Sequence, residues 1–305
     1  MDQVVVQVEA GQVELGPKRR TVGVVQGLDL RLQFRQASGF QNQFVLEGLC
    51  SGIGVDHLRE PMEQAVDATA ARIGVGDLDT LEVPLHAVSR GSGVTILSLD
   101  YALAPEHMYP IALEQCQDGL LWADQHRAEL GVDGPLGVGG DSAGGNFAAL
   151  LSQWAVATGG PTLDWQVLIN PVLDFPAVEK ASTESHRLYG DSPMLSTEAM
   201  QVFLASYFES PAAMVEASPL CTDIDCSALP PAFIAVGECD ALHDDSVNYA
   251  KKLRAAGVPV QLEVYQGMPH NFMTLTNISG TARRFLKDLT DATTAWANGA
   301  NAGQP

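Results

Sequence analysis

The stretch GVGGDSAGGNFAAL, residues 137–150, constrains the fold more than any other part of this sequence. It carries G-x-S-x-G between a short apolar strand and a helix rich in alanine and glycine. A serine in such a sharp, strained turn needs small neighbours, because the strand and the helix pass close on either side. The turn would present Oγ of Ser142 at a helix N-terminus, where the N–H of Ala143 can donate to a developing oxyanion. A plain glycine-rich turn is the alternative, but the flanking strand and helix favour a nucleophile.

Short apolar runs alternate with helical stretches from about residue 94 onward, as in successive βαβ units. The expected strands start at Val94, Leu136, Trp165, Ala232 and Val260, and the expected helices cover 110–130, a stretch from about Ala143, 244–256 and 279–297. This recurrence predicts an α/β fold with a mainly parallel central sheet and helices on both faces. Residues 183–212 break the rhythm as a long helical insertion, which we expect to lie over the sheet as a cap.

The two ends of the chain differ from this pattern. The first 67 residues show strand-like alternation in places, such as LDLRLQF from Leu28, but neither an amphipathic helix nor a clear buried strand. We therefore divide the chain into an atypical N-terminal segment at 1–73, a catalytic domain at 74–297 and a frayed tail at 298–305.

Composition excludes several classes of function. A formal net charge of −20 over 305 residues would repel a phosphate backbone, so we expect neither nucleic acid nor an anionic membrane surface as a partner. The N-terminus has no basic segment followed by an apolar run, and no stretch approaches the ~18 apolar residues of a membrane span. A cytoplasmic protein is expected. Five cysteines form no disulfide framework or CxxC pattern, and Cys221 and Cys226 read as two free thiols.

A serine is a weak nucleophile at neutral pH and needs a base and an orienting carboxylate, which in such a sheet follow later strands. Asp240 comes just after the apolar run AFIAVG, and His270 lies in the loop after VQLEVY. Both are therefore expected at the carboxyl edge of the sheet with Ser142. An aspartate that caps the next helix is the alternative for Asp240, but Asp244 or Asp245 fits that role more naturally.

The sequence resembles the hormone-sensitive-lipase-like carboxylesterases of the α/β-hydrolase superfamily over roughly residues 74–290. The motifs that carry the resemblance, in family order, are GDLDT at Gly76, SLDYALAPEHMYP at Ser98, GGDSAGGN at Gly139, ASPL at Ala217, LPPAFIAVGECDALHDDS at Leu229 and GMPHNF at Gly267. The resemblance implies an α/β-hydrolase fold, a Ser142–Asp240–His270 triad and an oxyanion donor at Ala143. It also implies hydrolysis of short to medium acyl esters, no metal or organic cofactor, and a cap at 183–212 that shapes the acyl and alcohol pockets.

One family motif is missing. Members carry His-Gly-Gly-Gly about seven residues before the glycine of GDLDT, where this chain has Thr69-Ala70-Ala71-Arg72. Ala70 and Ala71 can still offer N–H groups to an oxyanion, but a Cβ resists the backbone angles that glycine permits. A His-Gly-Gly codon run, CAC-GGC-GGC, read one base later encodes Thr-Ala followed by another alanine. We therefore hypothesise a frameshifted or misjoined reading before residue 74. The competing interpretation is a natural variant with a rebuilt N-terminal hairpin.

The sequence thus predicts a serine carboxylesterase that acts through an acyl-enzyme on a small-molecule ester. A catalytically impaired or non-enzymatic ligand-binding protein of the same fold is the alternative, because the oxyanion glycines are missing. An amidase or peptidase would use the same triad, and the sequence does not discriminate between them. It also leaves the oligomeric state open, with a homodimer as one alternative.

Overall fold

The computed structural model describes residues 81–130, 132 and 134–299, together with four strands nearer the N-terminus. These strands are β1 (Val5–Glu9), β2 (Arg20–Thr21), β3 (Arg31–Phe34) and β4 (Phe44–Leu49). Ala70, Ala71 and the rest of 50–80, with GDLDT at 76–80, lie outside the described residues, as does the tail from residue 300.

All described strands join one sheet in the order β2-β3-β1-β5-β4-β6-β7-β8-β9. The later strands are β5 (Thr95–Asp100), β6 (Leu136–Asp141), β7 (Trp165–Ile169), β8 (Ala232–Gly237) and β9 (Val260–Tyr265). From β1 to β9 every neighbouring pair is parallel, whereas β3 pairs antiparallel with both β1 and β2. The predicted mainly parallel sheet is therefore confirmed, and each predicted strand is present within a few residues of its expected start.

The N-terminal segment contributes more to the sheet than its sequence suggests. β4 lies between β5 and β6, in register from Phe44 opposite Thr95 and Leu136. No clear buried strand could be found in residues 1–67 of the sequence, but the structure places β4 there, inside the sheet. The run FVLEGL includes a glutamate and a glycine, both of which are depleted in strands, so its pattern is weak.

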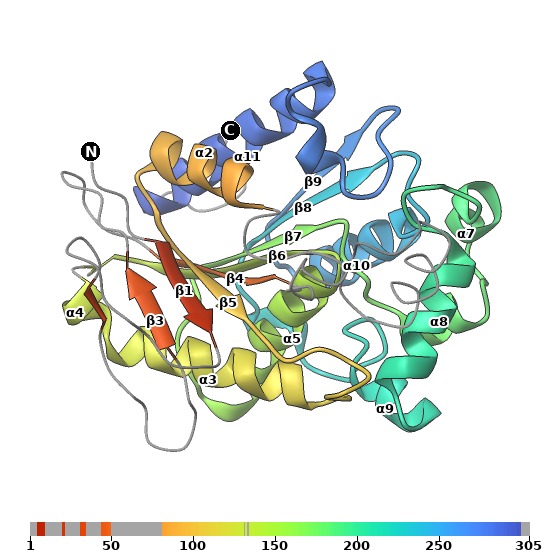
Figure 1. Ribbon diagram of the computed structural model, residues 1–305, viewed down its shortest axis with the longest axis horizontal. Helices are drawn as coiled ribbons and strands as arrows, with labels where there is room; N and C mark the ends of the chain where they lie inside the picture. The colour runs from red at the N-terminus through yellow and green to blue at the C-terminus, as the bar shows by residue number, and fades with distance from the viewer. Residues whose placement is uncertain are drawn as a thin grey trace, which may run out of the picture.

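Helices cover both faces of the sheet, as predicted (Figure 1). Two of them, α2 (Glu82–Ser92) and α11 (Gly280–Ala297), pack against each other on one face. The 3₁₀ turn η3 (Phe272–Leu275) packs against α11. The opposite face carries α3 (Ile111–Gln125), the short α4 (Arg127–Leu130), α5 (Ala143–Thr158) and α10 (His243–Ala255). Helix α2 was not predicted.

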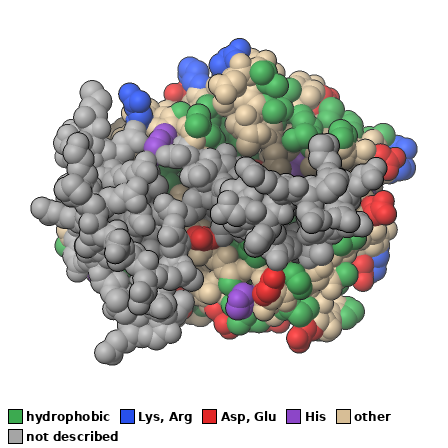
Figure 2. All heavy atoms as spheres, in the orientation of Figure 1, with side chains coloured by type: hydrophobic (Ala, Val, Ile, Leu, Met, Phe, Trp, Pro, Cys, Tyr) green, Lys and Arg blue, Asp and Glu red, His purple; other side chains and the backbone are tan. Residues whose placement is uncertain are grey.

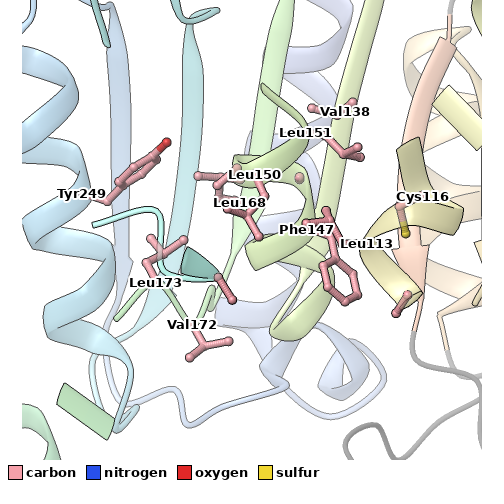
Figure 3. Packing of buried hydrophobic residues seen from close by; sticks show 14 of the residues in the cluster. Leu113, Cys116, Val138, Phe147, Leu150, Leu151, Leu168, Val172, Leu173 and Tyr249 are labelled. Carbon is pink, nitrogen blue, oxygen red and sulfur yellow. The ribbon is translucent and has the colours of Figure 1, made fainter. Parts of the chain in front are cut away.

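Alternation along the strands divides the core into two layers. Leu168 of β7 and Ile234 of β8 join the cluster formed with α3, α5 and α10, whereas Val167 and Phe233 join the cluster under α11. Successive side chains of a strand point to opposite faces, so a continuous apolar strand supplies both layers. Figure 3 shows the first cluster, in which Phe147 and Leu150 of α5 pack over the strands.

Between β7 and β8 the chain forms the predicted helical insertion. Its helices are α6 (Phe175–Glu179), α7 (Glu184–Tyr189), α8 (Thr197–Tyr207) and α9 (Pro211–Glu216), before the 3₁₀ turn η2 (Cys226–Ala228). Helical structure therefore extends beyond the expected 183–212 at both ends. The reason is local: Asp174 and Ser210 each accept a hydrogen bond at a helix N-terminus, and proline occupies the first turn of both α6 and α9.

The surface reflects the acidic composition. In the face shown in Figure 2, acidic side chains lie along the right and lower edges of the described surface, and basic side chains lie along the upper edge and among the acidic ones at the right edge. Within the described part of the chain, no helix combines the length and the apolar character needed to cross a membrane.

Candidate active site

Ser142 occupies the turn between β6 and α5 in a conformation that most residues avoid. Its backbone has φ 57° and ψ −115°, outside the regions that side chains with a Cβ prefer. The surroundings hold it there: the Ser142 N–H donates to Ile169 O at 2.8 Å, and the Asn146 N–H donates to Ser142 O at 3.1 Å. A Cβ on Gly140 would overlap the backbone of Gly144. Gly140, two residues before the serine, is therefore required by the close passage of strand and helix, as the sequence predicted.

Asp240 and His270 reach the same edge of the sheet from two neighbouring strands. Asp240 follows the end of β8, and His270 follows the end of β9, which pairs with β8 in parallel. The loop before His270 crosses directly over the end of β8, where the Cys239 N–H donates to Met268 O at 2.9 Å. A Cβ on Gly237 would overlap that same Met268 oxygen. Gly237 thus permits the crossing that carries His270 to the end of β8.

The three side chains meet in one line of hydrogen bonds. His270 Nδ1 lies 2.8 Å from Asp240 Oδ2, and His270 Nε2 lies 3.0 Å from Ser142 Oγ. An ionised carboxylate only accepts, so the proton of the neutral imidazole resides on Nδ1 and Nε2 is free to accept from the serine. Asp240 and His270 are both buried, at 0% and 3% exposure. The structure therefore brings together the three residues that the sequence singled out.

Electrostatics at the site favour a basic imidazole. Burial alone would lower the pKa of His270, but the adjacent Asp240 carboxylate and, at longer range, Asp141 raise it above its ordinary value. Burial raises the pKa of Asp141 to about 6, although His270 and the amide of Asn170 lower it. Burial therefore outweighs these two contacts, and the pKa of the carboxyl beside the nucleophile lies above its ordinary value.

Two asparagines that the sequence reasoning missed hold the site together. Asn170, fully buried at the end of β7, donates to Asp141 Oδ1 at 3.3 Å and accepts the Gly237 N–H at 3.1 Å. Asn146, buried in the first turn of α5, donates to Val172 O and Ala217 O, both at 2.9 Å. A polar residue at the end of an apolar strand, as in WQVLIN, was the available signal for Asn170.

Asp244 and Asp245 do not cap α10, contrary to expectation. Leu242 is the N-cap residue, with no side-chain hydrogen bond, and both aspartates lie inside the first turn. Asp245 Oδ2 accepts the N–H groups of Leu173 and Asp174, and Asp244 Oδ2 accepts the N–H of Ser185. The two carboxylates accept these three N–H groups in place of those at the start of α10, because buried N–H groups need a hydrogen-bond partner.

The oxyanion donors are described only in part. Ala143 is the first residue of α5, so its N–H belongs to the unpaired N-terminal turn beside Ser142. The other predicted donors, Ala70 and Ala71, lie outside the described residues. In the part of the chain that the structure covers, no group of three or more His, Cys, Asp or Glu side chains is placed to hold a metal ion.

This fold and this turn define the class of protein. The chain belongs to the α/β-hydrolase fold family, whose profile matches residues 73–274. Among curated proteins it is similar to the carboxylesterase NlhH of Mycobacterium tuberculosis, with 37% identity over 204 residues, which is 65% of this chain and 63% of that protein. It is also similar to the ethyl acetate hydrolase of Pseudomonas putida, with 34% identity over 224 residues, 72% of this chain and 68% of that enzyme. The matched region thus spans less than two thirds of the length of NlhH.

Superposition on solved structures also supports the α/β-hydrolase fold. The esterase of Pyrobaculum calidifontis superposes with a TM-score of 0.76 and 28% identity, over 92% of this chain and 84% of that one. The thermostable carboxylesterase EstE1, cloned from a metagenomic library, superposes with a TM-score of 0.77 and 29% identity, over 97% and 92% of the two chains.

Proposed function

We propose that this protein is a serine carboxylesterase of the hormone-sensitive-lipase-like group, which hydrolyses short to medium acyl esters through an acyl-enzyme. The observation that carries the proposal is the line of hydrogen bonds from Asp240 through His270 to Ser142, at a strained strand-to-helix turn. The similarity to proteins named carboxylesterase and ethyl acetate hydrolase supports the choice of esters as substrates.

In the proposed mechanism, Ser142 Oγ attacks the ester carbonyl carbon while His270 Nε2 takes its proton. The imidazolium then gives that proton to the leaving alcohol as the tetrahedral intermediate collapses to the acyl-enzyme. A water molecule, activated by the same nitrogen, releases the acid and restores Ser142. Asp240 holds the imidazole in the required tautomer and stabilises its positive charge, which is consistent with the raised pKa of His270.

The negative charge on the substrate oxygen needs donors that are already in place. The N–H of Ala143 at the start of α5 is the proposed first donor, helped by the positive end of the helix. Ala70 and Ala71 are the proposed further donors. A missing oxyanion donor costs a factor of about 10² to 10³ in turnover. An impaired oxyanion loop would therefore give a slow enzyme rather than an inactive one.

The insertion from α6 to α9 is the proposed cap. Its helices contribute Leu204 and Tyr207 to the same buried cluster as Phe147 of α5, the helix that follows Ser142, so the insertion packs on that side of the sheet. Leu188 and Val202, on α7 and α8, remain partly exposed. We propose that this segment shapes the acyl and alcohol pockets.

Hydrolysis of p-nitrophenyl acetate and butyrate tests the proposal. Wild type should release p-nitrophenol, and Ser142→Ala should lose that activity. Ser152→Ala is the matched control, because it removes a buried hydroxyl from the same helix, where Oγ only donates to Ala148 O. Activity that survives in Ser142→Ala would refute the mechanism, and no activity in wild type would favour a non-enzymatic protein. A panel of matched esters and amides separates an esterase from an amidase.

Intact mass after treatment with a serine-directed phosphonate tests activation of Ser142 without any choice of ester. One adduct is expected on wild type and none on Ser142→Ala. Resequencing upstream of codon 74 tests the frameshift hypothesis, which is ruled out if no alternative frame there encodes His-Gly-Gly.

A further inference from the structure

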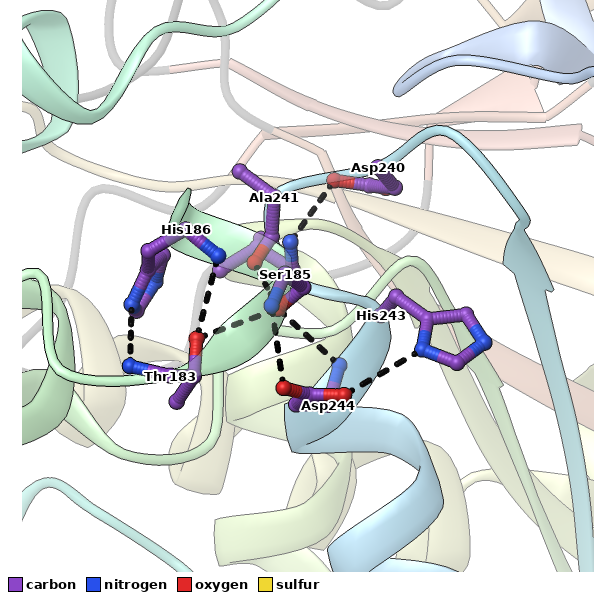
Figure 4. Close-up of polar contacts among 8 residues, drawn as sticks. Thr183, Ser185, His186, Asp240, Ala241, His243 and Asp244 are labelled. Carbon is purple, nitrogen blue, oxygen red and sulfur yellow. Dashed lines mark hydrogen bonds and ion pairs between the residues drawn. The ribbon is translucent and has the colours of Figure 1, made fainter. Parts of the chain in front are cut away.

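A buried serine of the insertion contacts the turn that carries Asp240. Ser185 is 3% exposed, and its Oγ donates to Ala241 O at 2.7 Å (Figure 4). Its N–H donates to Asp244 Oδ2 at 3.0 Å, and its Oγ accepts the Asp244 N–H at 3.3 Å. Three hydrogen bonds therefore join the start of α7 to the turn between β8 and α10.

The direction of the Ser185 hydroxyl is fixed by its neighbours. Thr183 Oγ1 lies 3.1 Å from Ser185 Oγ and accepts the His186 N–H at 3.2 Å. Since the Ser185 proton goes to the Ala241 carbonyl, Thr183 is left to donate to Ser185 Oγ. A hydroxyl that accepts two hydrogen bonds and donates one has no rotational freedom left.

The two ends of a single peptide group connect Ser185 to Asp240. The carbonyl of Ala241 accepts from Ser185, and the N–H of Leu242, in the same peptide plane, donates to Asp240 Oδ1 at 2.9 Å. A peptide group is planar, so a donor that fixes its carbonyl end also fixes its N–H end. Ser185 and the Asp240 carboxylate therefore contact opposite ends of one rigid peptide group.

The Asp240 carboxylate also contacts the other two residues of the triad, directly or through His270. The other carboxylate oxygen, Oδ2, holds His270 Nδ1 at 2.8 Å, and His270 Nε2 faces Ser142 Oγ. Hydrogen bonds in such a chain polarise one another in a buried environment. The insertion is therefore connected to the nucleophile through an unbroken series of polar contacts.

We propose that Ser185 is a positioning residue for the triad, which aims the Asp240 carboxylate at His270 through the peptide between Ala241 and Leu242. The inference rests on the proposed function of Ser142, Asp240 and His270. Because Ser185 touches neither the nucleophile nor the base, its loss should lower the rate of chemistry and leave substrate binding unchanged.

Steady-state kinetics on p-nitrophenyl butyrate with Ser185→Ala provide the first test. We expect kcat to fall by about tenfold, with KM within about twofold of wild type, since only the transition state needs the aligned imidazole. Ser218→Ala is the matched control. Ser218 is also a fully buried serine next to the insertion, and its Oγ also donates to a carbonyl, Met214 O, and accepts a backbone N–H, from Phe175. Its loss should lower Tm in the same way as Ser185→Ala and leave kcat within about twofold of wild type.

Ser185→Cys covers the case in which the alanine variant does not fold. The thiol is somewhat larger than the hydroxyl and is a weak donor, so kcat should lie between those of wild type and the alanine variant. A kcat equal to that of wild type in a folded Ser185→Ala or Ser185→Cys protein overturns the inference. So does an equal loss of kcat in Ser218→Ala, or an effect confined to KM.

A proton NMR spectrum separates this inference from the proposed function. The Nδ1–H of His270, shared with the Asp240 carboxylate, should give a resonance far downfield of the amide region in wild type and in Ser218→Ala. In Ser185→Ala this resonance should move upfield or broaden, and an unchanged resonance overturns the inference. The signal does not depend on turnover, so it decides the role of Ser185 even if wild type hydrolyses no ester.

Discussion

Replacing Asp245 with asparagine should remove a pH-dependent loss of stability. Asp245 is 1% exposed, and its burial, together with the nearby carboxylates of Asp174 and Asp240, raises its pKa from 3.8 to about 7, although two accepted backbone hydrogen bonds oppose the shift. In the unfolded chain the same carboxyl ionises near its ordinary pKa of 3.8. The folded state holds the proton to a higher pH, so the stability that this group contributes is complete below that pKa and is lost as the pH rises through 7.

The size of the effect follows from the shift. A displacement from 3.8 to about 7 corresponds to about 4 kcal/mol of unfolding free energy, lost between pH 4 and pH 8. Asparagine cannot ionise, and both hydrogen bonds, from Leu173 at 2.7 Å and Asp174 at 3.1 Å, end on the single oxygen Oδ2. An amide oxygen in that place keeps both. The variant should therefore match wild type near pH 4 and exceed it at pH 8, by up to about 4 kcal/mol and several degrees in Tm.

Thermal and urea unfolding followed by far-UV circular dichroism, at intervals from pH 4 to pH 8, measures this difference. Other titrating groups are common to both proteins and largely cancel when the two curves are subtracted. Asp223→Asn, at an exposed loop position, controls for the loss of one negative charge. If the difference between wild type and Asp245→Asn stays constant across this pH range, or if the variant is the less stable protein at pH 8, the reasoning is refuted.

The remaining predictions concern the site. Asp240→Asn should lower kcat by about 10⁴ because it favours the wrong imidazole tautomer, and a loss below tenfold in the ester assay would contradict the assigned role. Gly237→Ala should lower both Tm and activity, because its Cβ meets Met268 O, whereas Gly280→Ala, which meets only the end of a flexible arginine, should not. The pH profile of kcat/KM should fall as the pH drops, with a midpoint above 6.5, because His270 must be neutral and its pKa is raised. A midpoint below 6.5 would contradict the influence of Asp240.

Much of the sheet from β5 to β9, and the three residues of the triad, could be predicted because the sequence signals for them are local. The turn at Ser142 needs small residues on both sides, and the run AFIAVG predicts β8 with the bounds that the structure gives. Asp240 and His270 could be placed because the carboxyl ends of parallel strands meet at one edge.

Other features depend on contacts between distant segments, which no local pattern records. Asp245 looks like a helix cap in the sequence, but its partners Leu173 and Asp174 are about 70 residues away along the chain. The same holds for Asn170, whose partner Gly237 lies on another strand. Helix α2 was missed because its sequence, EVPLHAVSRGS, combines a proline with a glycine and a serine near its end. β4 was missed because its glutamate and its glycine interrupt the apolar run by which the other strands were found.

The contacts of Asp244 and Asp245 bear on how relatives of this protein can be recombined. A chimaera that exchanges only the segment from Leu173 to Glu216 would place foreign N–H groups against the two carboxylates, which in this chain accept from Leu173, Asp174 and Ser185. Those carboxylates lie one turn beyond Asp240, so a poor fit would be transmitted to the reacting centre. The exchangeable unit is therefore the insertion together with residues 240–245, although the two are separated in the chain by the whole of β8.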